Sequence, residues 1–251
     1  MSVPNILATR YASAAMRSIW TPENKIRAER RLWLTVMEAQ ADLGVSFGGD
    51  DPEQVLADYQ AVLDDVDLDS IAEREAITRH DVKARIEEFN ALAGHEHIHK
   101  GMTSRDLTEN IEQMQVLESL RLVRDKMVAT LNQLSRLAAQ FSDQAIAGRS
   151  HNVAAQVTTL GKRFATAIDE MLVAWDHVNE LIERYPARGI KGPMGTAQDM
   201  LDLLGGDESK LDDLEHRVAD HLGFNQVLTS TGQIYPRSLD FEVMSTLVQV
   251  L

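Results

Sequence analysis

The sequence predicts an all-α protein built around long helices. Glycine and proline, the residues that most often interrupt helices, are absent from Glu53 to Ala93, from Met102 to Ala147 and from Lys162 to Tyr185. In the last two intervals, apolar residues recur every three or four positions, as on one face of a helix. Strand signals are scarce, and only Gln226 to Ser230 suggests a short strand.

The first hundred residues predict shorter helices. We expect them at Lys25 to Leu43, at Pro52 to about Leu63 and at Leu68 to about Leu92. A loop rich in histidine and glycine follows, from Gly94 to Gly101. We therefore predict a small N-terminal helical domain over residues 1–101 and a long-helix bundle domain over residues 102–251.

Two rods form the predicted bundle. The first carries an apolar stripe from Leu107 to Ala138 and would reach about 55–60 Å at 1.5 Å per residue. The second carries a similar stripe from Leu160 to Ile182. Rods of this length favour lengthwise packing against other subunits. A fresh apolar pattern runs from Leu239 to Val250 without a stop signal, so we interpret the chain as the N-terminal portion of a truncated bundle.

Composition excludes several classes of protein. The 251 residues include 39 acids and 25 bases, giving a net charge of -14, and no cysteine. Disulfides and thiolate metal sites are therefore excluded, and the acidity argues against general binding of nucleic acid or anionic membranes. No apolar stretch approaches the length of a membrane span, and the N-terminus does not resemble a secretory signal. We expect a soluble cytoplasmic protein.

The acidic residues are unevenly distributed. None lies in residues 1–22, 144–168, 184–198 or 221–239, which contain most of the glycine-containing loops. The same stretches hold nine bases: Arg10, Arg17, Arg149, Lys162, Arg163, Arg184, Arg188, Lys191 and Arg237. Backbone amides in glycine-rich turns bind anions together with Lys or Arg. The stretches therefore predict a small, multiply anionic ligand, unless they are only solvated loops that lack acids.

Two groups of histidines are candidates for chemistry. His95, His97 and His99 alternate, but no carboxylate follows at ligand spacing, so we expect a hydrogen-bonding or exposed cluster and no metal. His151 lies in an acid-free turn before the second rod and is suited to proton transfer near neutral pH. Its alternative role is that of a loop or capping histidine.

Three short motifs combine structural and functional interpretations. Thr103 and Asp106 fit a capping box at the start of the first rod, and the same helix start suits a carboxylate or phosphate. Arg79-His80-Asp81 places a base, a titratable ring and an acid together, although a solvated helix face is the usual explanation. Arg10-Tyr11 is a candidate phosphate clamp. The sequence contains no catalytic triad, P-loop, dinucleotide fingerprint or zinc spacing.

Six motifs follow one another along the chain. They are Leu7-Ala-Thr-Arg-Tyr-Ala-Ser13, Arg79-His-Asp-Val82, His99-Lys-Gly-Met-Thr-Ser-Arg-Asp106, Gly148-Arg-Ser-His151 with Thr158-Thr-Leu-Gly-Lys-Arg163, Lys191-Gly-Pro-Met-Gly-Thr196 and Gly232-Gln-Ile-Tyr-Pro-Arg237. In their order and spacing they resemble the adenylosuccinate lyase family of the fumarase/aspartase superfamily. The similarity covers the whole chain and looks closest to actinobacterial members.

The resemblance implies β-elimination of fumarate without a cofactor or metal. Adenylosuccinate would give AMP, and the succinylaminoimidazole carboxamide ribotide (SAICAR) would give its carboxamide product (AICAR). Such substrates carry a phosphate and two carboxylates. The implied substrate-binding residues are Arg10 and Tyr11 for the phosphate, Arg79, His80 and Asp81 on the nucleotide side, Thr103 and Ser104 for the succinyl carboxylates, and Gln233 and Arg237 from the last loop.

The resemblance also assigns the proton transfers and the assembly. His151 matches the family's general acid, whereas the base is a serine within Gly-Ser-Ser-x-Met-Pro-x-Lys-x-Asn, which these 251 residues do not contain. We therefore expect this portion alone to be inactive. The implied assembly is a homotetramer whose active sites each take residues from three subunits. The alternatives are another superfamily lyase, such as argininosuccinate lyase, or a non-catalytic helical assembly module.

Overall fold

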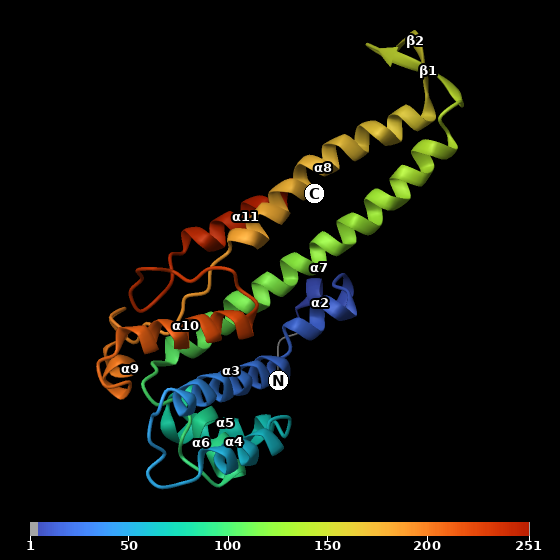
Figure 1. Ribbon diagram of the computed structural model, residues 1–251. Helices are drawn as coiled ribbons and strands as arrows, with labels where there is room; N and C mark the ends of the chain where they lie inside the picture. The colour runs from blue at the N-terminus through green and yellow to red at the C-terminus, as the bar shows by residue number, and fades with distance from the viewer. Residues whose placement is uncertain (1–4, 251) are drawn as a thin grey trace. The chain divides into compact units, whose positions relative to one another are not determined.

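A computed structural model describes residues 5–250 (Figure 1). These residues form two compact units. The first unit contains residues 5–117 and 185–236, and the second contains residues 118–184 and 237–250. One long helix, α7 (Ser104–Gln140), contributes its beginning to the first unit and its remainder to the second. The chain therefore leaves the first unit along α7 and returns to it at Tyr185.

Short helices make up the first unit. Capping side chains start several of them, and in two cases a proline follows the cap. The side chain of Thr21 accepts from the amide of Asn24, and the side chain of Asp51 accepts from the amide of Glu53. The helices are α1 (Ile6–Arg10), α2 (Ala14–Ile19), α3 (Pro22–Asp42), α4 (Pro52–Ala61), α5 (Leu68–Thr78), α6 (Asp81–Ala93), α9 (Gln198–Leu203) and α10 (Glu208–Leu222). Helix α3 packs against both α4 and α10, and α6 packs against α4 and α5.

An aromatic cluster joins α3, α4 and α6. The Phe89 ring lies 6.3 Å from Trp33 and 5.0 Å from Tyr59 between ring centroids, and all three side chains are buried. Arg30 lies over the Phe89 ring and forms a buried ion pair with Glu88, with an N–O distance of 2.6 Å. Its guanidinium also donates to the carbonyl oxygens of residues 62 and 63, which compensates part of the cost of burying the charge, whereas Arg30 Nε and one oxygen of Glu88 have no hydrogen-bond partner.

The prediction of a single helix from Leu68 to about Leu92 is wrong, because two helices occupy this range. Helix α5 ends at Thr78, and Arg79 adopts a left-handed conformation with φ of 56°. His80 then caps α6 by accepting from the amide of Lys83. Glycine usually supplies the left-handed residue at such a helix end, so the absence of glycine concealed the break. The break places Arg79 and His80 on a corner.

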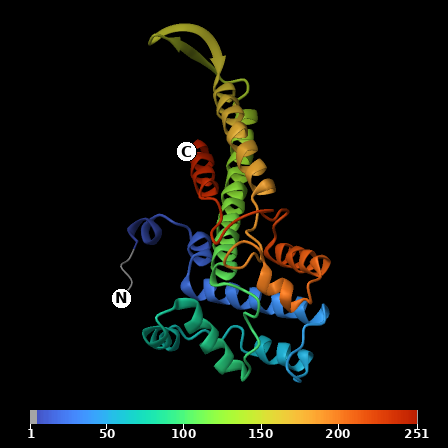
Figure 2. The ribbon, with the colours of Figure 1, turned by 90° about the vertical axis from the view of Figure 1, so that its left-hand side faces the viewer.

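The second unit consists of the remainder of α7, a β-hairpin and two further helices. The hairpin strands are β1 (Ala145–Ser150) and β2 (Val153–Thr159), and the helices are α8 (Leu160–Arg184) and α11 (Ser238–Val250). Helix α11 packs along α8, and the hairpin extends beyond the ends of α7 and α8 (Figure 2). At Gly161 an added Cβ would lie 2.4 Å from the carbonyl oxygen of Ala138, so glycine permits the close approach of α8 to the end of α7.

The sequence analysis did not predict the hairpin. The prediction of a strand at Gln226 to Ser230 is wrong. Strands β1 and β2 pair antiparallel around a two-residue turn in which His151 and Asn152 both have positive φ, 51° and 62°. Asn-Gly or Asp-Gly usually marks such turns, so His-Asn gave no clear signal. Val227 forms only an isolated bridge with Ala187.

The long rods agree with the expectation from apolar spacing. The compact units do not follow the predicted division at residues 101 and 102, since α7 runs through both of them. That boundary stays a prediction about domains. Among residues 5–250, none of the helices combines the length and apolar character needed to span a bilayer.

Candidate active site

A polar cleft lies at the start of α7 in the first unit. Its volume is about 380 Å³. Helix α3, the start of α6, the start of α7 and the loop after α10 all contribute to it. The lining residues are Lys25, His80, Asp81, Val82, Thr103, Ser104, Arg105, Thr108, Glu112 and Gln233. The structure thus brings together five of the predicted site residues, namely His80, Asp81, Thr103, Ser104 and Gln233.

The first turn of α7 carries the helix-start chemistry expected from the sequence. Asp106 accepts from the amide of Thr103 at 2.8 Å, which is the carboxylate half of a capping box. The first N–H groups of a helix have no acceptor within the helix, and the helix dipole favours negative charge there. With the hydroxyls of Thr103 and Ser104 beside these amides, the helix start is suited to a carboxylate or phosphate.

His80 links the start of α6 to the start of α7. Its Nδ1 accepts from the amide of Lys83 at 3.3 Å, so the neutral ring carries its proton on Nε2. Nε2 lies 3.3 Å from the Ser104 hydroxyl and is exposed to the cleft. The ring can therefore donate a hydrogen bond to an acceptor in the cleft.

Asp81 is held by a neighbouring cation. It pairs with Arg85, which also pairs with the buried carboxylate of Glu29. Burial raises the pKa of Glu29 above its usual value, while Arg85 opposes that rise. The negative charge of Asp81 is thus partly neutralised next to a cleft that we expect to receive an anion.

His99 lies shortly before the start of α7 but is not among the residues that line the cleft. Its Nδ1 accepts from the indole nitrogen of Trp33 at 3.0 Å. Burial, with a smaller contribution from the charge of His80, lowers the pKa of His99 to about 4. His99 is therefore neutral at pH 7 and carries its proton on Nε2. The alternating histidine pattern pointed to this residue, but only as one member of a cluster.

A buried ion pair fixes the two loops that border the cleft. Arg188 pairs with Asp106, and both side chains are inaccessible to solvent. The same guanidinium donates to the carbonyl oxygens of Gly192 at 3.0 Å, Gly232 at 3.1 Å and Gln233 at 3.1 Å. Asp106 also accepts from the amides of residues 191 and 192. One pair thus connects the start of α7 to the loop that carries Gln233.

Other buried polar residues of α7 support the same loops. Asn110 exchanges two hydrogen bonds with the backbone of Gly189, and Gln113 donates to the carbonyl oxygen of Pro186. Glu109 accepts from the amide of Tyr235 at 2.7 Å. These contacts explain why one face of α7 is polar yet fully buried. The face holds loop backbone instead of packing against apolar side chains.

The acid-free stretches do not supply a set of free cations. Arg188 forms the buried ion pair with Asp106, Lys191 pairs with Glu215 at 2.7 Å, and Arg184 pairs with Glu242. Arg17 donates to two backbone carbonyl oxygens. These four of the nine bases thus have partners within the protein, and the prediction of an anionic ligand at the acid-free stretches stays a prediction. The cleft obtains Lys25 from α3, which no sequence signal singled out.

Four predicted substrate contacts do not line this cleft. Arg10 and Tyr11 lie at the end of α1, where the guanidinium carbon is 5.8 Å from the centre of the ring, and both side chains are exposed. Arg79 adjoins His80 on the corner between α5 and α6. Arg237 belongs to the second unit and pairs with Asp240 at 3.6 Å.

His151 occupies the turn of the hairpin in the second unit. The side chain is exposed, and its Nδ1 lies 3.0 Å from the Ser150 hydroxyl. Both neighbouring strands hold the turn residue in its left-handed conformation. An exposed imidazole on such a projection is accessible for proton transfer.

Comparisons with known proteins agree with this arrangement. The model of a protein family described as "Lyase" matches residues 9–201. Adenylosuccinate lyase of Saccharomyces cerevisiae is 34% identical over 247 residues, covering 96% of this chain and 50% of the relative. The enzyme of the same name from Schizosaccharomyces pombe is 35% identical over 246 residues, covering 96% and 50%. The chain therefore spans about half the length of the curated relatives it matches.

Two solved structures share the fold. A fumarate lyase from Mesorhizobium sp. BNC1 superposes with a TM-score of 0.77 at 22% identity, covering 95% of this chain and 54% of that chain. The β-carboxy-cis,cis-muconate cycloisomerase of Acinetobacter calcoaceticus sp. ADP1 gives 0.79 at 17% identity, covering 98% and 56%. These similarities confirm the predicted fold class. The expected closeness to actinobacterial members stays a prediction.

Proposed function

Because the chain belongs to this family of lyases, we propose that the complete protein containing it is an adenylosuccinate lyase. It would release fumarate from adenylosuccinate and from SAICAR. The observation that carries the proposal is the cleft at the start of α7, where His80, Ser104 and Gln233 converge from separate elements. The curated relatives of the same name support the choice of substrate.

The cleft suits the succinyl part of such a substrate. Its carboxylates would lie against the first turn of α7, within reach of the hydroxyls of Thr103 and Ser104. His80 Nε2 and the Lys25 ammonium, which pairs with Glu112 at 3.3 Å, offer further donors in the same cleft. When the carbon next to one carboxylate loses its proton, negative charge builds up on that carboxylate, and fixed donors there lower the barrier.

The elimination requires two proton transfers. A base removes the proton from carbon, the carbon–nitrogen bond breaks as the carbon–carbon double bond of fumarate forms, and the departing nitrogen takes up a proton. We assign the second proton to His151, which is exposed on its turn. The family resemblance assigns the base to a serine outside these 251 residues.

Assembly and location belong to the same proposal. We assign a homotetramer in which His151 serves a cleft together with residues of other subunits, and no nucleic acid or membrane partner. Apolar side chains exposed on the second unit, such as Phe241 and Val248, support association between subunits. We also assign the complete protein a cytoplasmic location, as a lyase of purine biosynthesis.

The test uses the complete protein with adenylosuccinate as substrate. Release of fumarate, followed by ultraviolet absorbance, is the expected result, and SAICAR should also be cleaved. Turnover of argininosuccinate without turnover of adenylosuccinate would transfer the assignment to another lyase of the same fold. Absence of turnover with all three compounds would favour a non-catalytic assembly module.

A further inference from the structure

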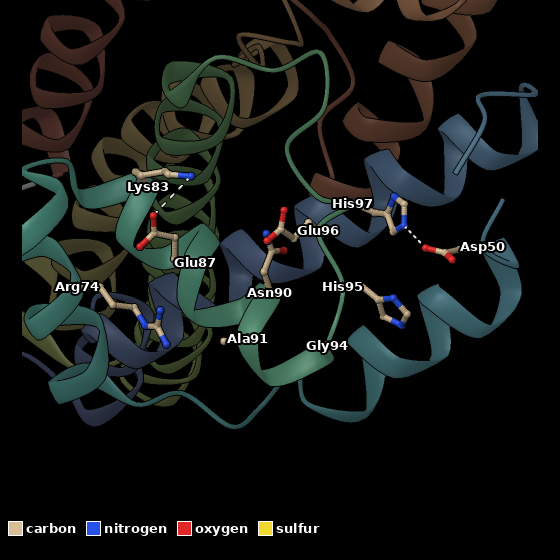
Figure 3. A pocket seen from close by; sticks show the side chains of 10 residues that line it. All are labelled: Asp50, Arg74, Lys83, Glu87, Asn90, Ala91, Gly94, His95, Glu96 and His97. Carbon is tan, nitrogen blue, oxygen red and sulfur yellow. Dashed lines mark hydrogen bonds and ion pairs between the residues drawn. The ribbon is translucent and has the colours of Figure 1, made fainter. Parts of the chain in front are cut away.

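We propose that Asp50, His95 and His97 form a binding site for a divalent transition metal ion, with Zn²⁺ as the representative ligand. The three residues belong to the first unit, and none of them is among those that line the cleft at α7. Figure 3 shows them beside one another. Their potential ligand atoms, two imidazole nitrogens and a carboxylate oxygen, all lie within 4.8 Å of one another. The proposed lyase chemistry does not use this site.

Buried aromatic residues hold the two histidines on one side of an extended segment. The Tyr59 hydroxyl accepts from the amide of His97 at 3.1 Å and bonds to the carbonyl oxygen of His95 at 3.0 Å. The rings of His95 and His97 lie 6.1 Å apart between centroids, and Phe47 packs against His97 at 5.1 Å. The position of both rings is thus set before any metal arrives.

The carboxylates around the histidines match the requirements of a metal site. Asp50 approaches His97 Nε2 at 2.8 Å. Asp58 bonds to His95 Nε2 at 2.7 Å, which leaves Nδ1 of that ring as the nitrogen available to a metal. A carboxylate on the second nitrogen of a metal-binding imidazole fixes the tautomer and orients the ring. Asp50 could not be selected from the histidine pattern, because it comes from the loop before α4 rather than from the histidine segment.

The geometry requires only small movements to bind an ion. Metal–nitrogen and metal–oxygen bonds of about 2.0–2.2 Å place tetrahedral ligands about 3.5 Å apart. Asp50 is exposed at the mouth of a pocket of about 660 Å³, which His95 and His97 also line, so its side chain can rotate toward the rings. Three nitrogen and oxygen ligands leave a fourth position for water.

Lys100 opposes metal binding. Its ammonium lies 2.7 Å from His97 Nδ1, so that nitrogen accepts a hydrogen bond and Nε2 carries the proton. A metal at Nε2 replaces this proton, and the ring then needs an acceptor for a proton on Nδ1. Glutamine at position 100 would offer an amide oxygen in place of the ammonium. Lys100→Gln should therefore strengthen the binding of Zn²⁺ several-fold.

The test is a calorimetric titration of chelator-treated complete protein with Zn²⁺. We expect one ion per chain at this site and at least tenfold weaker binding in His97→Gln and Asp50→Asn. His216→Gln, which removes an exposed histidine on α10, is the matched control and should bind like the wild type.

Two results would overturn the site. One is the absence of Zn²⁺ binding by the wild type, and the other is equal affinity in the wild type and in Asp50→Asn. If His97→Gln does not fold, Lys100→Gln still tests the site. Weaker or unchanged binding of Zn²⁺ by Lys100→Gln would contradict the assignment of Nε2 as the metal-binding nitrogen of His97. Since the readout is metal binding, its failure is distinguishable from failure of the proposed lyase activity.

Discussion

Arg188 shows how much of the cleft depends on one residue. The side chain is fully buried, pairs with Asp106 and donates to three loop carbonyl oxygens. No part of the guanidinium is left for a substrate. Its role is to position Gln233 relative to the start of α7, although its basic charge and its glycine-rich surroundings are typical of an anion-binding residue.

Replacing Arg188 should therefore destabilise the protein more than replacing an exposed arginine. Arg188→Met leaves the carboxylate of Asp106 buried without its cation, which typically costs about 3–5 kcal/mol in the free energy of unfolding. Arg217→Met, which removes an exposed arginine paired with Asp42, should change the stability little. Urea denaturation of both variants provides the comparison, and equal losses would contradict the role given to Arg188.

A double variant separates the pair from its surroundings. Adding Asp106→Asn to Arg188→Met removes the unpaired charge, so the loss should be smaller than the sum of the two single losses. Additive losses would show that the two side chains act independently.

At the scale of elements, left-handed residues shape both candidate regions. Arg79 ends α5 with positive φ and thereby turns His80 toward Ser104, and His151 forms half of the hairpin turn. Non-glycine residues rarely adopt this conformation. The sequence therefore predicted the rods, which depend on apolar spacing, but it did not predict the corner or the hairpin, which depend on single backbone angles.

Substitution at position 151 can separate the turn from the chemistry. Asparagine accepts the left-handed conformation, so His151→Asn should preserve the hairpin while removing the imidazole. We expect kcat of the complete protein to fall by about 10²–10⁴ without a change in its circular dichroism spectrum. Asn152→Gly, at the neighbouring turn position with φ of 62°, is the control and should retain activity.

The candidate site, like the fold, could be predicted only in part from the sequence. Five residues were selected by motif and are gathered in one cleft by the structure, namely His80, Asp81, Thr103, Ser104 and Gln233. Lys25 was not selected, because its contribution depends on how α3 packs. Asp50 was missed for the same reason, since 45 residues separate it from His95.

At the scale of the whole molecule, the apolar surface of the second unit supports the proposed association between chains. Phe241, Met244 and Val248 share one face of α11 and are exposed to 75%, 61% and 64%. Val173 of α8 is also exposed. A row of large apolar side chains open to water is typical of a surface that a partner covers.

Charges on this face should disrupt the assembly. We expect the complete protein to be a tetramer by light scattering, and the double substitution Phe241→Glu with Val248→Glu to give smaller species with reduced lyase activity. Ile77→Glu changes an exposed apolar residue on α5 of the first unit and should leave both properties unaltered. An unchanged mass for the double variant would contradict the role of this face.

The return of the chain at Tyr185 also constrains how the protein is made. Asp106 meets Arg188 and the Gln233 loop only after the intervening residues of α7, the hairpin and α8 have been synthesised. Domains begin to fold during synthesis from the N-terminus, so α3 to α6 can pack while the buried polar face of α7 still lacks its loops. The polar side chains of that face therefore lack their loop partners until the chain has been synthesised past residue 233.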